Sequence, residues 1–273
     1  MNVLFWNLCR KDSFTNVIAD IIRDEEIDLV AFAEFPKGKE LFFESELRAV
    51  DKSFTYLEPI ADNRRIDVFY KSGIVDIINS FGGERIIVDR IHSSANGQDY
   101  YIVFCHLRDA RNVSKEQLAG FAREIVKEIL DFEKEKDNHH LIVCGDFNMN
   151  PYDNAMIEHD SFNAMQTAAL ANKCNRNVYG KPYLLFYNPM WGLFGDLHGQ
   201  DVPGTYYYAP SIPIQPYWHI LDQVIMRPEV INVFDKKQLK IVTKGPSYNL
   251  LNANNNICHK YSDHLPIKFT LNI

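Results

Sequence analysis

Five residues near the middle of the chain, Cys144-Gly145-Asp146-Phe147-Asn148, carry the side chains with the clearest chemical use. They follow a short run, 140–143, whose apolar residues indicate a buried strand. Residues i and i+2 of an extended backbone point to the same side, so we expect Asp146 and Asn148 to project together from the strand end. A carboxylate can activate water and an amide can contact a phosphoryl oxygen. The pair therefore suits hydrolysis of a phosphate ester.

Three further polar positions stand at other points of the chain. Asn7 closes the first apolar run, Glu34 closes the second, and Ser262-Asp263-His264 lies near the C-terminus. Taken alone, Asn7 is typical of a turn and Glu34 of a solvated strand end. Mg²⁺ prefers carboxylate and amide oxygens, and the ends of sequential strands are usually neighbours. Asn7 and Glu34 together indicate a metal site, to which Asp263 could add a ligand.

His106 ends another apolar run, 101–105. A lone histidine at a strand end is more often structural than catalytic, so the residue by itself leaves both roles open. Arg108 and Arg111 follow it closely. They could hold a phosphate oxygen bidentately or pair with Asp109 and other surface acids, and the sequence favours neither.

The elements that must position these residues alternate between helix and strand. We expect strands at 2–6 and 27–32 and a run of short strands between 56 and 107. The clearest helix begins at Ser114, where Gln117 completes a capping box, and its apolar stripe runs on to about Lys136. Late strands follow at 221–226, 239–243 and 265–271. This mixed order predicts two packed sheets with helices outside.

The bulk composition predicts one globular domain. The chain has 273 residues, of which 46% are hydrophobic and 24% charged, so we expect a single unit over 1–273. The net charge of −7 opposes simple electrostatic capture of nucleic acid, although a local basic patch and a metal ion can offset it. Four lysines gather near the C-terminus and fit either a solvated surface or a phosphate contact: Lys236, Lys237, Lys240 and Lys244.

Cysteine usage and apolar segments bear on location. The five cysteines are odd in number and show no C-x-x-C spacing, which predicts reduced thiols and a cytoplasmic setting. The first residues lack the pattern of a signal peptide. The longest uncharged stretch, 202–221, holds four prolines and cannot be a membrane helix, so no stable membrane association is expected.

The aromatic-rich residues 172–218 predict a long loop insertion.

The order of these motifs resembles the endonuclease/exonuclease/phosphatase superfamily. This group of metal-dependent phosphoesterases includes pancreatic deoxyribonuclease and the abasic-site endonucleases. The resemblance runs from Asn7 to His264 and departs from the family between 151 and 218. It implies an α+β fold, a four-layer α/β/β/α sandwich of two packed mixed sheets with outer helices. It also implies Mg²⁺ (or Mn²⁺) bound by Asn7, Glu34 and Asp263.

The same resemblance assigns catalytic roles. Asp146 would orient or deprotonate the attacking water, and Asn148 would contact the phosphate. Asp222 matches the late-strand acid that orients the catalytic imidazole of His264, which would stabilise the pentacovalent phosphate or transfer a proton. His106 looks like the second catalytic imidazole of the deoxyribonuclease-like and sphingomyelinase-like branches.

The function that follows is a divalent-metal-dependent phosphodiesterase acting on nucleic acid, DNA or RNA. An alternative is a phosphatase or phosphodiesterase for a small-molecule or lipid phosphate ester, because the aromatic insertion could shape a pocket. A third, non-catalytic binding module is disfavoured because all the polar positions that the resemblance requires are filled. The sequence leaves the oligomeric state open.

Overall fold

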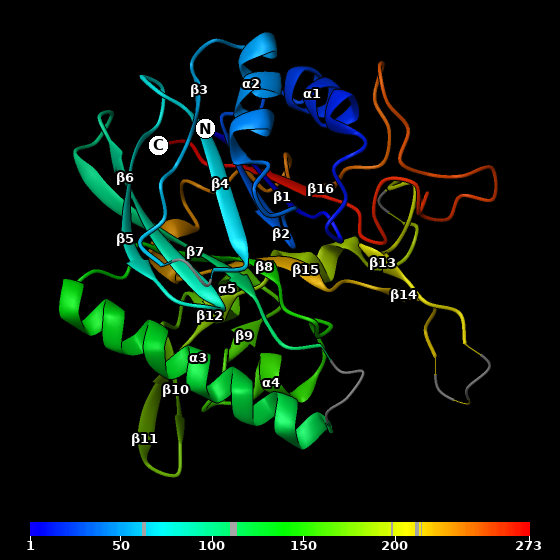
Figure 1. The fold of residues 1–273 in the computed structure, drawn as a ribbon. Helices are drawn as coiled ribbons and strands as arrows, with labels where there is room; N and C mark the ends of the chain where they lie inside the picture. The colour runs from blue at the N-terminus through cyan, green and yellow to red at the C-terminus, as the bar shows by residue number, and fades with distance from the viewer. Residues whose placement is uncertain (62–63, 110–113, 198, 211–212, 214) are drawn as a thin grey trace.

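The chain folds into two large sheets between helical layers (Figure 1). The computed structural model describes residues 1–61, 64–109, 114–197, 199–210, 213 and 215–273. Helices α1 (Thr15–Asp24) and α2 (Glu40–Val50) lie over one sheet, and α3 (Lys115–Lys136) lies over the other. This arrangement confirms the α+β sandwich that the sequence predicts.

The first sheet holds the N-terminal strand near its middle. Its order is β16-β17-β1-β2-β4-β3, and β1 and β2 are parallel whereas the other neighbours are antiparallel. The strands are β1 (Asn2–Asn7), β2 (Leu29–Ala33), β3 (Phe54–Tyr56), β4 (Ile66–Lys71), β16 (Lys240–Ile241) and β17 (Ile267–Thr270).

The second sheet has the order β5-β6-β7-β8-β15-β12-β9, with β7 and β8 parallel at its centre. Its strands are β5 (Asp76–Gly82), β6 (Ile86–Ser93), β7 (Gln98–His106), β8 (Leu141–Asp146), β9 (Ala164–Met165), β12 (Phe186–Tyr187) and β15 (Asp222–Met226). Short helices α4 (Asn154–Ile157), α5 (Ala168–Ala171), η1 (Pro189–Leu193) and η2 (Pro228–Val230) complete the connections.

Alternation along the strands builds two cores. Ile102 and Phe104 of β7 belong to the core between the sheets, whereas Tyr101 and Val103 belong to the core under α3. Successive strand residues point to opposite faces, so one apolar strand serves both cores. This packing fixes the central strands and therefore the positions of the residues at their ends.

Helix α3 shows how local sequence sets these boundaries. The Ser114 hydroxyl accepts a hydrogen bond from the Gln117 N–H at 3.3 Å, and the Gln117 side chain accepts one from the Ser114 N–H at 2.8 Å. This reciprocal box confirms the predicted start, and the helix ends at Lys136 as expected. Among the described residues, no helix has both the length and the apolar character needed to cross a membrane. All five cysteines are described and free.

The segment 172–218 is more ordered than the loop that the sequence predicts. It forms the hairpin β10 (Asn175–Val178) and β11 (Lys181–Leu184), and it supplies β12 to the second sheet. It also contributes β13 (Tyr206–Tyr207), and β14 (Trp218–His219) begins at its last residue. Strands of two to four residues leave too short a pattern to be recognised among many aromatic residues, prolines and glycines.

Gly145 allows β7 and β8 to approach each other just before the polar strand ends. A Cβ atom at this position would lie 2.0 Å from the carbonyl oxygen of Cys105, its partner in the parallel register. Real side-chain atoms do not come this close to backbone. The glycine between Cys144 and Asp146 is therefore required by packing, and it brings the β8 end against the β7 end.

One buried acid lies apart from these strand ends. Asp89 of β6 is 0% exposed, and neither of its carboxylate oxygens has a hydrogen-bond partner within the described part of the chain. Its cross-strand neighbours are Ile102 and Asn79. Burial raises the pKa of Asp89 to about 8.

Asp89 should make stability fall as pH rises. The pKa is higher in the folded than in the unfolded chain, so between about pH 4 and pH 8 the folded state holds a proton that the unfolded state lacks. The free energy of unfolding should then drop by roughly 1.4 kcal/mol per pH unit from this group. In Asp89→Asn that slope should disappear, as measured by urea unfolding at pH 5 and pH 8. An equal difference between variant and wild type at both pH values would contradict the prediction.

Candidate active site

The predicted polar residues meet at one edge of the two sheets. Asn7 ends β1, and Glu34 follows β2, its parallel neighbour. In the second sheet His106 ends β7 and Asp146 ends β8, and the two are register partners. Asp222 begins β15 opposite Asp146. The sheet register thus brings together residues that are far apart in the sequence.

Asp146 lies at the centre of this group. Its Oδ2 accepts a hydrogen bond from the Asn7 side-chain amide at 3.0 Å, and its Oδ1 accepts one from the Asn148 N–H at 2.9 Å. The Nε2 atom of His106 lies 3.7 Å from Oδ2. Burial raises the pKa of Asp146 above its ordinary value, although the nearby imidazole of His264 opposes the shift. Two hydrogen bonds thus hold the carboxylate in place, with the His106 ring close to it.

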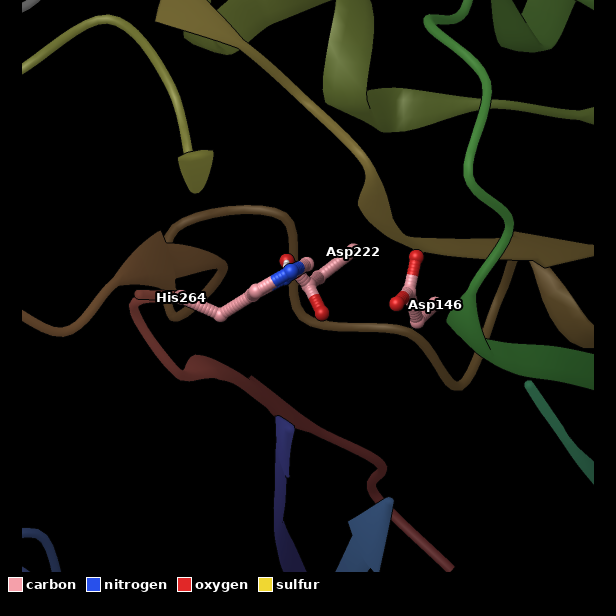
Figure 2. A group of neighbouring side chains, drawn as sticks. All are labelled: Asp146, Asp222 and His264. Atoms are coloured by element: carbon pink, nitrogen blue, oxygen red, sulfur yellow. Dashed lines mark hydrogen bonds and ion pairs between the residues drawn. The ribbon is translucent and has the colours of Figure 1, made fainter. Parts of the chain in front are cut away.

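His264 and Asp222 form a buried pair beside Asp146 (Figure 2). The Nδ1 atom of His264 lies 2.8 Å from Asp222 Oδ2. Burial disfavours the imidazolium, but the carboxylates of Asp222 and Asp146 outweigh it and raise the pKa of His264 to about 10. The ring is therefore cationic at neutral pH, with Nδ1 donating to Asp222.

The backbone around His264 is fixed by two further hydrogen bonds. The Ser262 hydroxyl donates to the Asn7 carbonyl at 2.6 Å and accepts from the His264 N–H at 3.1 Å. The indole N–H of Trp6 donates to the His264 carbonyl at 2.9 Å. The last residues of β1 thus orient the C-terminal triplet.

His106 is the second imidazole, and its charge state is the opposite. Its Nε2 lies 3.7 Å from both Glu34 Oε1 and Asp146 Oδ2. Burial lowers the pKa of His106; Asp146 opposes this, and the cations of Arg85 and Arg65 reinforce it. One ring is kept neutral and the other charged. Environments that shift the pKa values of two titratable groups in opposite directions are typical of acid–base sites.

The donors present fit a hard divalent cation. The Glu34 side chain is 25% exposed, and among the described residues its carboxylate lies 3.6 Å from Arg10 Nε and 3.7 Å from His106 Nε2. Burial raises the pKa of the Cys9 thiol, Asp263 raises it further by its charge and by a hydrogen bond, and Glu34 adds a smaller effect, so both carboxylates lie within electrostatic reach of Cys9. Mg²⁺ takes one or two carboxylates and keeps several waters, so an accessible carboxylate pair beside Asn7 suits it.

A second set of possible metal ligands consists of Asp146, Asp222 and His264. Their ligand atoms lie within 4.8 Å of one another, and all three residues are buried (Figure 2). We assign this group to proton chemistry instead, because Asp222 holds the Nδ1 atom of His264 and Asp146 is held by Asn7 and by the Asn148 N–H.

Asn148 departs from the expected geometry. The strand ends at Asp146, and Asn148 takes a left-handed conformation with φ 53°. The expectation that both side chains project together from extended backbone is therefore wrong. The Asn148 side-chain amide instead donates to the Leu107 carbonyl at 3.1 Å. It holds the loop that follows His106, and its contact with a phosphate stays a prediction.

Solved structures match the chain over nearly its whole length, whereas no protein-family model and no curated protein matches it. An endonuclease/exonuclease/phosphatase family protein from Bacteroides thetaiotaomicron is 13% identical, with a TM-score of 0.58 over 99% of this chain and 97% of that one. A humanized TDP2 from D. rerio is 14% identical, with a TM-score of 0.59 over 100% and 99%. A mannosyl-6-phosphatase from B. thetaiotaomicron is 14% identical, with a TM-score of 0.58 over 99% of both chains.

This chain has the endonuclease/exonuclease/phosphatase fold. The two mixed sheets and their outer helices correspond to the sandwich that the motifs suggested. TDP2 from D. rerio has also been solved with a single-strand DNA product, and that structure covers 100% of this chain with a TM-score of 0.54 and 14% identity. The fold alone is thus shared by proteins whose names point to different phosphate esters.

Of the two predicted phosphate-binding arginines, Arg108 lies within the described residues. Arg108 is exposed, and its guanidinium lies over the Phe121 ring of α3, 4.1 Å from the centroid. Arg111 lies outside the described residues. Stacking leaves the guanidinium edges of Arg108 able to donate, so its role stays a prediction.

Arg85 was not recognised in the sequence. Its backbone carbonyl accepts a hydrogen bond from the His106 N–H at 3.0 Å, and its Nη1 donates to the His106 carbonyl at 3.4 Å. Arg65 lies close by and shares Glu84 with it. The two guanidiniums give the His106 side of the site a positive character. The position of Arg85 beside His106 follows from the register between β6 and β7, and that register cannot be recognised in the sequence.

Thr205 is a second residue that sequence reasoning missed. Its buried hydroxyl accepts hydrogen bonds from the N–H groups of Leu221 and Asp222, both at 3.1 Å. Its carbonyl accepts one from the Leu265 N–H at 2.8 Å. It therefore positions both Asp222 and the segment of His264.

The C-terminal lysines favour the surface interpretation. Lys240 pairs with Glu25 at 2.7 Å, and Lys244 pairs with Asp201 at 2.6 Å. Lys236 lies over the Tyr187 ring, 5.3 Å from the centroid. Three of the four lysines therefore have a partner within the protein.

Proposed function

We propose that this chain is a divalent-metal-dependent phosphodiesterase that cleaves nucleic acid. The observation that carries the proposal is the convergence of a central buried carboxylate, Asp146, with two imidazoles of opposite charge state. Hydrolysis of a phosphodiester needs a base for water and positive charge for the phosphoryl oxygens. Both are supplied within one group of contacts.

The residues divide this work between them. Asp146, fixed by Asn7 and Asn148, accepts the proton of the attacking water. The cationic ring of His264, held through Nδ1 by Asp222, presents Nε2–H to a phosphoryl oxygen. The neutral ring of His106 lies on the other side of Asp146 and orients the water or the departing oxygen. A cation held by Asn7, Glu34 and Asp263 would supply charge neutralisation of the phosphate when bound.

Three observations favour nucleic acid as the substrate. The side of the site near His106 carries Arg65 and Arg85. Two exposed tyrosines, Tyr208 after β13 and Tyr217 before β14, lie next to the strand that bridges to His264. TDP2, which shares the fold, is described with a single-strand DNA product. The second candidate, a phosphatase for a small phosphate ester, is supported by the equal likeness to a mannosyl-6-phosphatase and by the net charge of −7.

One substrate panel separates these candidates. The purified protein is incubated with labelled single- and double-stranded DNA, RNA and small phosphate esters, each with Mg²⁺, Mn²⁺ or EDTA. We expect strand cleavage that EDTA abolishes. Hydrolysis of small esters alone would replace the nuclease by the phosphatase. Full activity in EDTA would remove the metal from the proposal, and calorimetry of Mn²⁺ binding to wild type and Glu34→Gln checks the metal site without an activity readout.

A further inference from the structure

The short sheet formed by β13 and β14 is continuous with the catalytic residues. Tyr206 of β13 forms a backbone bridge to His264, and it pairs with His219 of β14. The preceding residue, Thr205, holds the backbone of Asp222. In Figure 1 these two strands lie beside β15, beyond the edge of the large sheets. The sheet therefore extends the site on the side of His264.

Its two faces differ in their surroundings. Tyr207 and Trp218 pack against the main core, with ring centroids 5.0 Å apart. Tyr206 and Tyr208 alternate with Tyr207 and so point to the other face. The Tyr206 ring lies 4.9 Å from that of His264 and 6.5 Å from that of Tyr208, at interplanar angles of 47° and 30°. A row of rings thus leads outward from the catalytic imidazole.

The outer end of the row is open to solvent. Tyr208 is 51% exposed, although it is a large aromatic residue. The whole stretch 202–221 contains no Asp, Glu, Lys or Arg. A ligand on this face is therefore bound by ring contact rather than by ion pairing. Nucleobases offer flat π-faces that stack on tyrosine, and each stacked base contributes about 1–3 kcal/mol.

We propose that Tyr206 and Tyr208 form a stacking platform for an unpaired nucleobase next to the scissile phosphodiester. The inference rests on the proposed nuclease function and narrows its substrate to single-stranded nucleic acid, because a base paired within a duplex cannot lay its face on the rings. The platform starts at the ring contact with His264, so a stacked base places its own phosphate beside that imidazole.

The test compares two labelled single strands. One has a normal sequence, and the other carries tetrahydrofuran in place of the nucleosides flanking a single cleavable phosphodiester. Wild type should cleave the base-bearing strand with a kcat/KM about tenfold or more higher. In Tyr208→Ala this ratio should fall toward one, chiefly through KM, and Tyr208→Phe should restore it. The matched control is Tyr179→Ala, at the turn of the β10–β11 hairpin, which is 93% exposed and should keep the wild-type ratio.

The outcomes separate the inference from the function on which it rests. Equal cleavage of the two strands by wild type, or an unchanged ratio in Tyr208→Ala, overturns the platform and leaves the nuclease standing. Cleavage of neither strand overturns the nuclease itself and the platform with it. As a second readout, a strand bearing 2-aminopurine should lose fluorescence on binding to Asp146→Asn. In the double variant with Tyr208→Ala that quenching should weaken, and full quenching there contradicts the platform.

Discussion

Asp146→Asn should lower kcat by about 10³-fold while leaving the fold intact. The asparagine keeps an oxygen that can accept from Asn7 or from the Asn148 N–H, so the packing at the end of β8 survives. It cannot accept the proton of the attacking water, and loss of a general base costs on the order of 10²–10⁴ in rate. The measurement is steady-state kinetics on the best substrate of the panel, with the thermal unfolding midpoint recorded in parallel.

The control for this variant is Asp131→Asn. Asp131 is an exposed acid of α3, and its substitution makes the same change of charge far from the strand ends. It should leave both kcat and the midpoint as they are in wild type. If Asp146→Asn retained more than about a tenth of the wild-type kcat, Asp146 would not be the base.

Much of the fold could be predicted because its signals are local. The capping box at Ser114 and the apolar stripe of α3 lie within one helix, and the structure reproduces both ends. The runs that end at Asn7 and Asp146 are continuous and apolar, so their strands were recognisable. Resemblance to a family then supplied the topology that periodicity alone does not give.

The side-chain positions that the sequence did not predict depend on contacts between distant residues. Thr205 acts through hydrogen bonds to Asp222 and through the Leu265 N–H, and nothing near it in the sequence indicates either. Arg85 faces His106 only because of the register between β6 and β7. Asn148 does not project beside Asp146, because the strand ends at Asp146 and Asn148 itself takes a left-handed conformation. In each case tertiary packing, rather than local preference, sets the side chain's position.

The opposite charge states of the two histidines follow from that packing. Burial disfavours the charged form of both rings. For His264 the carboxylates of Asp222 and Asp146 outweigh burial and raise the pKa, whereas for His106 the cations of Arg85 and Arg65 reinforce burial and the pKa is lowered. The sequence shows His106 after an apolar run and His264 before one, and only the three-dimensional arrangement shows how their surroundings differ. The difference in charge is therefore the property of the site that a single substitution at Asp222 should remove.

Asp222→Asn should lower kcat by about 10³–10⁴-fold, an effect of the size seen when the acid behind a catalytic histidine becomes an amide. The carboxylate stabilises the imidazolium of His264 and fixes its Nδ1 proton. An amide neither carries the charge nor enforces that tautomer, so the pKa of His264 should fall from about 10 toward its ordinary value.

The pH dependence tests this assignment in metal-free protein. In wild type the raised pKa keeps His264 protonated, and the stability that the pair contributes is fully present below about pH 6.5 and is lost only as pH rises through about 10. In Asp222→Asn the imidazole should lose its proton at much lower pH. Titration of the histidine ring protons by NMR measures both values. The variant His139→Gln, which lacks one exposed histidine, identifies the signals of that residue and so separates them from those of His264. A variant whose His264 still titrates near pH 10 would show that Asp222 does not hold the charge, and the imidazolium would then have to be ascribed to Asp146.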